Sequence, residues 1–348
     1  MKFAIVYILL FLSVCTYAQD INIGFTETIQ SEQLQEKREY LVYLPEQYSN
    51  EKYKSQQYPV IYLLDGEKFF HVMSGIVKNL STGYYPVMPE CIIVAIKNTN
   101  RSRDLTPTQV SDVGYDSGGA DTFSSFITTE LMPKINKTYR TLGYNVLVGH
   151  SFGGLFVINT LFKNTNTFNA YIAIDPSLWW DNALFVNQLD DYLQTTDFNK
   201  KALFLANANA LLYKNKTAKQ DDAHSNAKEL AIEKMNITAP KHLNFNIKYY
   251  PEEDHGSVVL PAFIDGFRTV FKGYRVNVKE VMNNPAVLKT HFQMVSENLG
   301  INFKSQCAYI DRVVDLMIER DLLDHAKILN ELNMELYPKN DYLKTKFK

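Results

Sequence analysis

The chain has 348 residues and a formal net charge of −2 at pH 7, and 46% of its residues are hydrophobic. This near-neutral balance lacks the excess of lysine and arginine that nucleic acid or an anionic membrane surface requires, so neither is expected as a partner. The length fits one α/β domain with an accessory segment, and three cysteines are too few for a disulfide framework.

The first eighteen residues are typical of a secretory signal peptide. Met1-Lys2 precedes an apolar run over 3–14, and a small–x–small end predicts cleavage after Ala18 and a secreted or periplasmic protein. A lipoprotein signal ending at Cys15 is the minor alternative. The apolar run is too short to cross a bilayer, and no later stretch is apolar enough, so no membrane span is expected.

Beyond the signal, apolar runs alternate with helical patterns. The segments 21–28 and 38–44 alternate in polarity as antiparallel strands do. Continuous apolar runs, as in parallel strands covered on both faces, lie at 59–64, 91–96, 145–148, 170–174 and 202–206, and an alternating edge-side strand lies at 243–250. Helices are expected over 118–135, 155–162 and 260–271. The pattern predicts an α/β fold with a mostly parallel sheet and helices on both faces.

One motif interrupts this alternation between a strand and a helix. Gly149-His150-Ser151-Phe152-Gly153 has the Gly-x-Ser-x-Gly form of the nucleophile elbow of α/β-hydrolases, in the strand–turn–helix context that the motif requires. The two glycines admit a turn too tight for a Cβ atom, so Ser151 is the predicted nucleophile. The backbone N–H of Phe152 is a predicted oxyanion donor, and His150 is expected to pack behind the turn.

His255 is the predicted general base, because it directly follows the last predicted strand, where the histidine of this fold belongs. The identity of the acid stays open. The usual position after 202–206 reads Asn207-Ala-Asn-Ala-Leu-Leu212 and holds no carboxylate. Asp222 is the first choice, and Asp221, Asp175 or a Ser–His dyad are alternatives, since the acid mainly orients the imidazole.

The remaining predicted site residues also follow strands. The turn after 59–64 is expected to supply a second oxyanion N–H from Gly66 or Glu67. Arg101, Trp179 and Trp180 are expected to contact substrate, or else to wall the cleft. No metal-ligand spacing, phosphate loop or dinucleotide fingerprint is present, so no metal and no cofactor is predicted.

After about residue 274 the pattern becomes helical. Apolar residues at helical spacing over 310–318 and 326–336 predict a hairpin that resembles one tetratricopeptide repeat. The predicted organisation is therefore a signal peptide over 1–18, a catalytic domain over 19–274 and a helical extension over 275–348. A single repeat cannot bury its own face, so packing against the domain is expected, with binding of a protein partner as the alternative.

The chain resembles the enterochelin esterase and esterase D-like branch of the α/β-hydrolases from about Tyr40 to Phe271. The matching pieces, in chain order, are Pro59-Val-Ile-Tyr-Leu-Leu-Asp-Gly66, Ile92-Ile-Val-Ala-Ile-Lys-Asn98, Gly149-His-Ser-Phe-Gly-Gly154, Pro176-Ser-Leu-Trp-Trp180 and Glu253-Asp-His-Gly-Ser-Val258.

This resemblance implies a cofactor-independent serine esterase for a small-molecule ester, with Ser151 as nucleophile and His255 as base. A siderophore-type ester would suit an arginine and tryptophans at the rim. The missing carboxylate after 202–206 departs from the family pattern. Two alternatives are a deacetylase of polysaccharides on the same apparatus and a hydrolase-fold protein that binds without catalysis.

Overall fold

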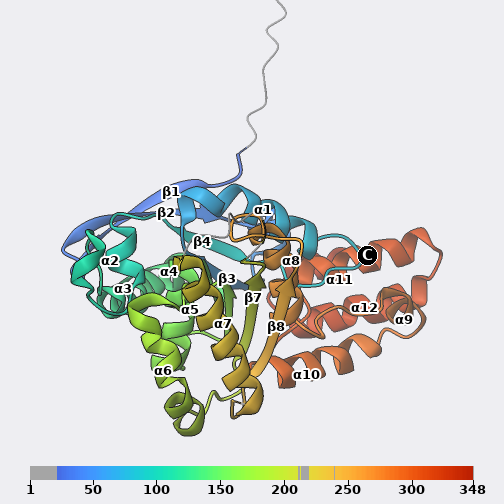
Figure 1. The fold of residues 1–348 in the computed structure, drawn as a ribbon. Helices are drawn as coiled ribbons and strands as arrows, with labels where there is room; N and C mark the ends of the chain where they lie inside the picture. Colours follow the sequence, from blue (N-terminus) through green and yellow to red (C-terminus); the bar gives the residue numbers. More distant parts are fainter. Residues whose placement is uncertain (1–21, 211, 213–218, 239, 348) are drawn as a thin grey trace, which may run out of the picture.

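A twisted sheet forms the centre of the molecule. The structure, a computed structural model, describes residues 22–210, 212, 219–238 and 240–347, so the predicted signal peptide lies outside the described residues. In these residues the sheet has eight strands in the order β1-β2-β4-β3-β5-β6-β7-β8 (Figure 1). The pairs β1–β2 and β2–β4 are antiparallel and the other pairs are parallel, which confirms the predicted mostly parallel sheet.

The strands agree closely with the apolar runs of the sequence. They are β1 (Phe25–Ser31), β2 (Glu36–Tyr43), β3 (Tyr58–Leu63), β4 (Ile92–Ile96), β5 (Thr141–His150), β6 (Ala170–Ile174), β7 (Ala202–Ala208) and β8 (Asn244–Tyr250). Successive side chains of a central strand point to opposite faces of the sheet, and each face has its own hydrophobic core. In β3, Ile61 and Leu63 pack on one face, and Val60 and Tyr62 pack on the other. Both faces therefore need a cover of helices.

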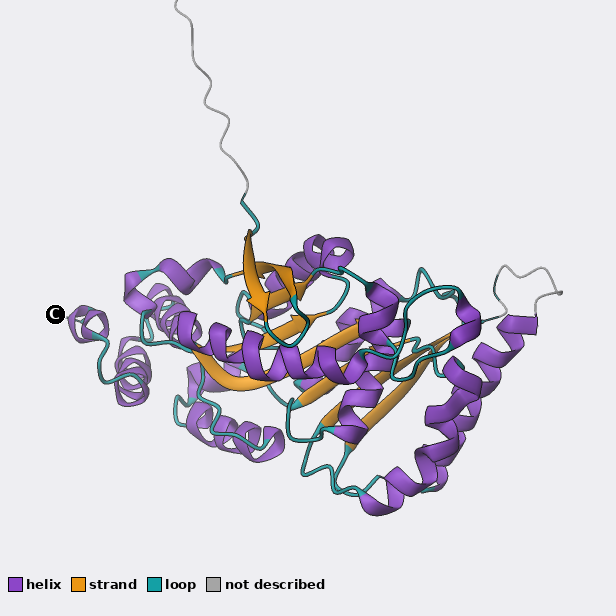
Figure 2. Ribbon diagram, turned by 90° about the vertical axis from the view of Figure 1, so that its left-hand side faces the viewer, coloured by secondary structure: helices purple, strands orange, loops and turns teal. Residues whose placement is uncertain are grey.

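Helices cover both faces (Figure 2). The face of Ile61 is covered by α1 (Gly66–Ser81) and α8 (Val259–Val270). The other face carries α3 (Ala120–Phe126), the π-helical turn η4 (Ile127–Leu131), α4 (Met132–Thr138), α5 (Phe152–Lys163), α6 (Trp180–Thr195) and α7 (Lys219–Ile237). A short helix, α2 (Arg101–Leu105), lies after β4. Among the described residues, no helix is both long and apolar enough to cross a bilayer.

The C-terminal extension packs against the sheet domain. Its predicted hairpin consists of α11 (Cys307–Glu319) and α12 (Leu323–Leu336), and it is preceded by α9 (Val278–Asn283) and α10 (Val287–Leu299), which the sequence pattern did not predict. The Glu90 N–H donates to Gln306 Oε1 at 2.8 Å, and Gln306 Nε2 donates to the Glu90 carbonyl at 3.0 Å. The rings of Tyr144 and Phe303 pack 5.7 Å apart.

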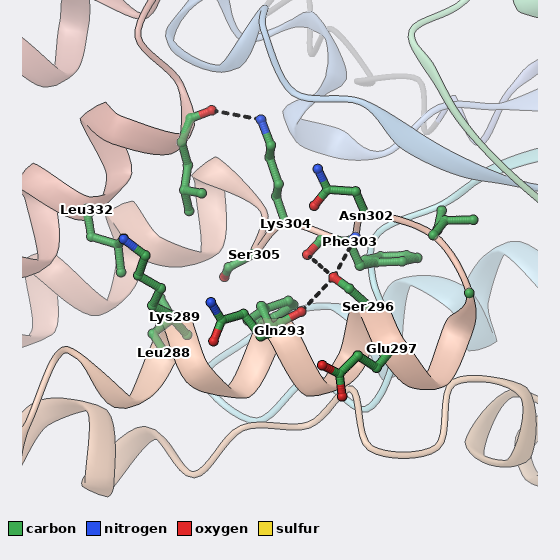
Figure 3. Close-up of a pocket in the computed structure, with 14 residues that line it drawn as sticks. Leu288, Lys289, Gln293, Ser296, Glu297, Asn302, Phe303, Lys304, Ser305 and Leu332 are labelled. Atoms are coloured by element: carbon green, nitrogen blue, oxygen red, sulfur yellow. Dashed lines mark hydrogen bonds between the residues drawn. The ribbon is translucent and has the colours of Figure 1, made fainter.

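These contacts place the extension at the amino-terminal ends of the strands, because Glu90 lies two residues before β4 and Tyr144 lies in the first half of β5. The extension also has a cavity of its own, of about 900 Å³, in which Ser296 Oγ accepts from the Phe303 N–H at 2.9 Å (Figure 3). The lining of this cavity comes entirely from residues 288–336. The carboxyl ends of the strands, where the predicted catalytic residues lie, are thus left uncovered by the extension.

Candidate active site

The turn between β5 and α5 holds Ser151 in a strained conformation. Ser151 has φ 61° and ψ −117°, values that a residue with a Cβ atom adopts only when its surroundings impose them. A Cβ atom at Gly149 would lie 2.4 Å from the carbonyl carbon of Gly153, so only glycine allows the strand and the helix to approach this closely. The Ser151 N–H is held by the carbonyl of Ile174 at 3.0 Å.

A cavity of about 470 Å³ opens over Ser151 at the carboxyl ends of the strands. Arg101, Phe152, Trp179 and His255, all predicted site residues, line it together with Ser151. Parallel strands present their carboxyl ends at one edge of a sheet, which is why residues more than a hundred positions apart meet here. Ser177 was not predicted from the sequence as a site residue, although its Oγ lies 3.3 Å from Ser151 Oγ. The one sequence feature that could have indicated it is its position just after β6.

His255 is oriented by Asp175. Its Nδ1 lies 2.6 Å from Asp175 Oδ2, and because an ionised carboxylate only accepts, Nδ1 carries the proton and Nε2 is left as the basic nitrogen. Asp175 is 1% exposed and follows β6. Its Oδ2 also accepts a hydrogen bond from His224 Nε2 at 3.1 Å. Its Oδ1 accepts a hydrogen bond from the Ala208 N–H at 3.0 Å and contacts the Lys228 ammonium.

These donors determine the charge of the carboxyl group. Burial alone would raise the pKa of Asp175, but hydrogen bonds from His224 and His255, together with the positive charge of Lys228, hold that pKa well below its usual value. Asp175 is therefore ionised in the neutral range. An ionised acid on Nδ1 is what stabilises an imidazolium when Nε2 takes a proton.

The end of β7, which follows the predicted strand 202–206 and has no carboxylate, donates a hydrogen bond to Asp175, the acid that follows the neighbouring strand β6. The donor is the backbone N–H of Ala208, as described above. Asp222, the first choice from the sequence, lies with Asp221 near the start of α7, and their side chains lie outside the described part of the structure. Of the candidate acids, Asp175 is the one that the described residues bring to His255.

His150 packs beneath the base, as expected of a residue behind the elbow. Its ring lies 4.5 Å from the ring of His255 and meets the edge of Phe69. Its Nε2 donates to the His255 carbonyl at 2.7 Å, so it holds the backbone of the residue that carries the base. Burial, reinforced by the neighbouring His255, lowers the pKa of His150 to about 4, so its ring is neutral at pH 7.

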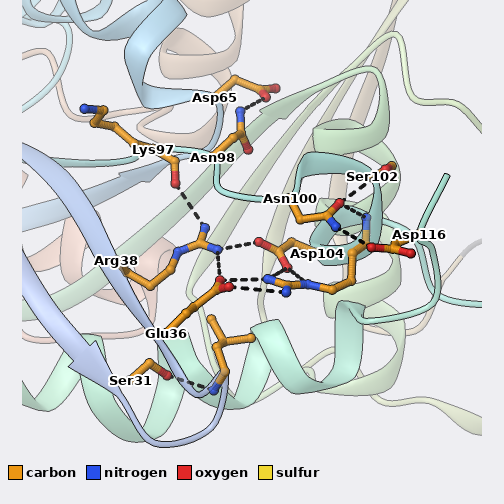
Figure 4. A network of polar contacts seen from close by, with 12 residues as sticks. Ser31, Glu36, Arg38, Asp65, Lys97, Asn98, Asn100, Ser102, Asp104 and Asp116 are labelled. Carbon is orange, nitrogen blue, oxygen red and sulfur yellow. Dashed lines mark hydrogen bonds and ion pairs between the residues drawn. The ribbon is translucent and has the colours of Figure 1, made fainter.

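Arg101 is fixed at the rim of the cavity by a bidentate ion pair. Its Nε and Nη2 donate to the two oxygens of Asp65 at 2.6 and 3.0 Å, and Nη2 also reaches the carbonyl of His150 at 3.3 Å. Asn98 Nδ2 donates to the same Asp65 at 2.8 Å (Figure 4). The Arg101 side chain keeps 35% exposure, so it is positioned and still accessible from the cavity.

The helix that carries Arg101 is anchored by a buried charge network. Arg38 on β2 and Asp104 on α2, each 1% exposed, are joined by a 2.6 Å contact. Glu36 bridges Arg38 and Arg103 in the same cluster (Figure 4). Because Arg38 and Asp104 are buried and paired with each other, removing either one would leave an unpaired buried charge, so this pair anchors α2 beside the site.

Two predicted site residues are not brought to the cavity. Trp180 is 2% exposed, and its Nε1 donates to Thr108 Oγ1 at 3.0 Å, so it packs behind the cavity wall. Gly66 begins α1 where a Cβ would lie 2.6 Å from the Ala95 carbonyl carbon, and it does not line the cavity. Phe152 does line it, and its backbone N–H stands in the first turn of α5, where helical N–H groups have no acceptor within the helix.

Comparisons with known proteins agree with this geometry. The Esterase family model matches residues 31–238. The siderophore enterobactin esterase of Emericella nidulans is 27% identical over 244 residues, 59% of this chain and 80% of that protein. The ferri-bacillibactin esterase BesA of Bacillus subtilis is 29% identical over 229 residues, 60% of this chain and 76% of that protein.

A solved structure extends the similarity to the C-terminal helices. The crystal structure of an IroE-like serine hydrolase from Shewanella oneidensis superposes with a TM-score of 0.81 at 34% identity, and the match covers 90% of this chain and 99% of that one. The fold is therefore that of the α/β-hydrolases. The chain belongs to the Esterase family, in its enterochelin esterase-like branch, and is a carboxylic-ester hydrolase.

Proposed function

We propose that the protein is an exported serine esterase that works through an acyl-enzyme and takes siderophore-type esters. The observation that carries the proposal is the 2.6 Å contact between His255 Nδ1 and Asp175 Oδ2. Both residues line the same cavity as Ser151, which lies in its strained turn. This arrangement leaves His255 Nε2 as a base directed by a buried, ionised acid.

In the proposed reaction, Ser151 Oγ attacks the ester carbonyl carbon while His255 Nε2 takes the hydroxyl proton. The negative charge that develops on the carbonyl oxygen is stabilised by the Phe152 N–H in the first turn of α5. The C–O bond to the alcohol then breaks, and His255 returns the proton to the leaving oxygen. A water molecule then gives a proton to His255 Nε2 and attacks the acyl carbon. The bond to Ser151 Oγ breaks, His255 returns the proton to Ser151, and the acid is released.

Asp175 acts in this scheme as the orienting acid, in place of Asp222. It fixes the Nδ1–H tautomer of His255 and stabilises the imidazolium that forms in both steps. Its own ionisation is secured by Lys228 and His224, which contact its two oxygens.

The proposed substrate class rests on the rim of the cavity and on the relatives. Arg101 offers a held guanidinium and Trp179 an indole, which suit an anionic, aromatic acyl group such as a catecholate. Of the two relatives described above, one is named as a siderophore enterobactin esterase and the other as a ferri-bacillibactin esterase. The proposed export rests on the signal-peptide pattern of residues 1–18.

The test is hydrolysis of three ester classes by the wild type and by Ser151→Ala. We expect turnover of enterobactin, a catecholate tri-ester, with a kcat/KM at least tenfold above that for p-nitrophenyl acetate and for an acetylated xylan. Ser151→Ala should abolish all of these activities. A preference for the acetylated xylan would instead identify a polysaccharide deacetylase, and no turnover of any ester would refute the proposal.

A further inference from the structure

Two histidines, rather than one, converge on the buried carboxylate of the active site. His224 Nε2 and His255 Nδ1 lie 3.1 and 2.6 Å from the same oxygen, Asp175 Oδ2. The three potential ligand atoms all lie within 4.8 Å of one another. A serine hydrolase needs only one histidine on its acid, so the proposed mechanism gives His224 no role beyond helping to keep Asp175 ionised.

We propose that Asp175, His224 and His255 form a binding site for a divalent transition-metal ion of the Zn²⁺ class. Two imidazoles and one carboxylate, with water as the fourth ligand, are a ligand set that zinc accepts. In a tetrahedral zinc site neighbouring ligand atoms lie about 3.3 Å apart, so the Asp175–His224 spacing already fits. The Asp175–His255 pair has to open slightly.

The ion can reach this site, and the ligand that has to move is free to do so. The cavity over Ser151 is lined by all three ligands. His255 is on a loop and its side chain is 47% exposed, whereas Asp175 is 1% exposed and fixed by its other contacts. A small rotation of His255 therefore accommodates the ion without moving the buried carboxylate.

Two features of the cluster limit its affinity. The Lys228 ammonium contacts Asp175 Oδ1, so it opposes a second cation and leaves Oδ2 as the single carboxylate ligand. The Nδ1 of His224 is buried without a hydrogen-bond partner among the described residues, so a proton moved there would find no acceptor. Both features favour weak, reversible binding rather than the tight binding of a structural zinc site.

Binding would inhibit catalysis through the tautomer of His255, a consequence that rests on the proposed function. When the ion takes the Nδ1 lone pair, the ring proton of neutral His255 resides on Nε2. That nitrogen then cannot accept the proton of Ser151, so the nucleophile is not activated. The ion takes no part in the hydrolysis itself; it inhibits the enzyme by preventing His255 from acting as the base.

The test is a calorimetric titration of chelator-treated wild type, His224→Gln and His242→Gln with ZnCl₂. Glutamine keeps an N–H donor for Asp175 but is a poor zinc ligand. His242 is the matched control, because its Nδ1 lies 2.9 Å from Asp197 in an exposed histidine–carboxylate pair elsewhere. We expect one zinc ion per wild-type chain, at least tenfold weaker binding by His224→Gln, and less than a twofold change for His242→Gln.

A second readout uses the folded wild type alone. Co²⁺ should give the strong visible absorption of a four-coordinate site, and Zn²⁺ should abolish it. Absence of zinc binding, equal affinities of wild type and His224→Gln, or a six-coordinate cobalt spectrum would each overturn the inference.

Hydrolysis of p-nitrophenyl butyrate, measured in parallel, should be inhibited by Zn²⁺ and restored by EDTA, with at least tenfold less sensitivity in His224→Gln. Inhibition of equal strength in His224→Gln would overturn the proposed inhibition. If the wild type turns over no ester, the proposed function fails while the calorimetry still decides the metal site.

Discussion

The buried His150 should make the stability of the protein fall steeply in mild acid. Its side chain is 6% exposed, and burial lowers its pKa from 6.5 to about 4. Between these two values the unfolded chain binds a proton at His150 that the folded chain does not bind. The stability that the neutral, buried ring contributes is therefore complete above pH 6.5, falls as the pH falls, and is fully lost below about pH 4.

The magnitude follows from the two pKa values. At about pH 5 the unfolded chain is mostly protonated at this position and the folded chain mostly is not, which costs about 2 kcal/mol of unfolding free energy relative to neutral pH. This is a large fraction of the stability of an ordinary domain. Other groups titrate in the same range, so the prediction concerns a difference between variants.

The assay is urea unfolding of the wild type and of His150→Gln at about pH 7.5 and about pH 5. Glutamine can still donate to the His255 carbonyl but does not titrate. We expect the wild type to lose about 2 kcal/mol more than His150→Gln over this interval. His71→Gln, a change at an exposed histidine, should behave as the wild type does. Equal losses in wild type and His150→Gln would refute the argument.

Three further predictions concern the site and its frame. Asp175→Asn should lower kcat on p-nitrophenyl butyrate by about a hundredfold or more, and Asp222→Asn should lower it by less than about threefold. Equal losses in the two variants would contradict the assignment of Asp175 as the acid. Gly149→Ala should lower the melting temperature by about 3–10 °C, because its Cβ meets backbone at 2.4 Å; an unchanged melting curve would show that the turn can relax. Arg101→Gln should raise KM for a carboxylate-bearing ester at least fivefold more than KM for its neutral analogue, as side-by-side kinetics would show, and equal changes would speak against substrate contact.

The sequence predicted the parts of the site that depend on the order of strands. The apolar runs identify strands, and in a parallel sheet each strand delivers its following residue to the same rim. Ser151, His255, Arg101 and Trp179 were all recognised as residues of this rim, and the structure places all four around one cavity.

The acid depends on contacts that no local pattern encodes. Asp175 reaches His255 because β6 and β7 pair in the register Ile174–Ala206, which aligns the Ala208 N–H with the carboxylate, and because α7 brings Lys228 over it. The partners of Asp175 thus come from segments that lie more than thirty positions away and are brought together only by the tertiary fold. The sequence therefore left Asp175 as one of several alternatives.

Burial explains the other differences. Trp179 and Trp180 are neighbours in the sequence, yet Trp179 lines the cavity and Trp180 is sealed beneath it, because consecutive side chains at the start of α6 point in different directions. Helix α9 has only six residues, too few for a helical pattern to be recognised. The buried residues of α10, Leu288, Phe292, Val295 and Leu299, do fall at helical spacing, so the sequence carried a signal for this helix that was missed.

The most direct test of the central claim is to label the protein with a fluorophosphonate and to locate the adduct by mass spectrometry. We predict a single adduct on Ser151, formed at least a hundredfold more slowly in His255→Ala, because the serine then lacks its base. Ser177 lies 3.3 Å away and would be the nearest alternative site of reaction. An adduct on Ser177, or no adduct on the folded wild type, would contradict the assignment of Ser151 as the nucleophile activated by His255.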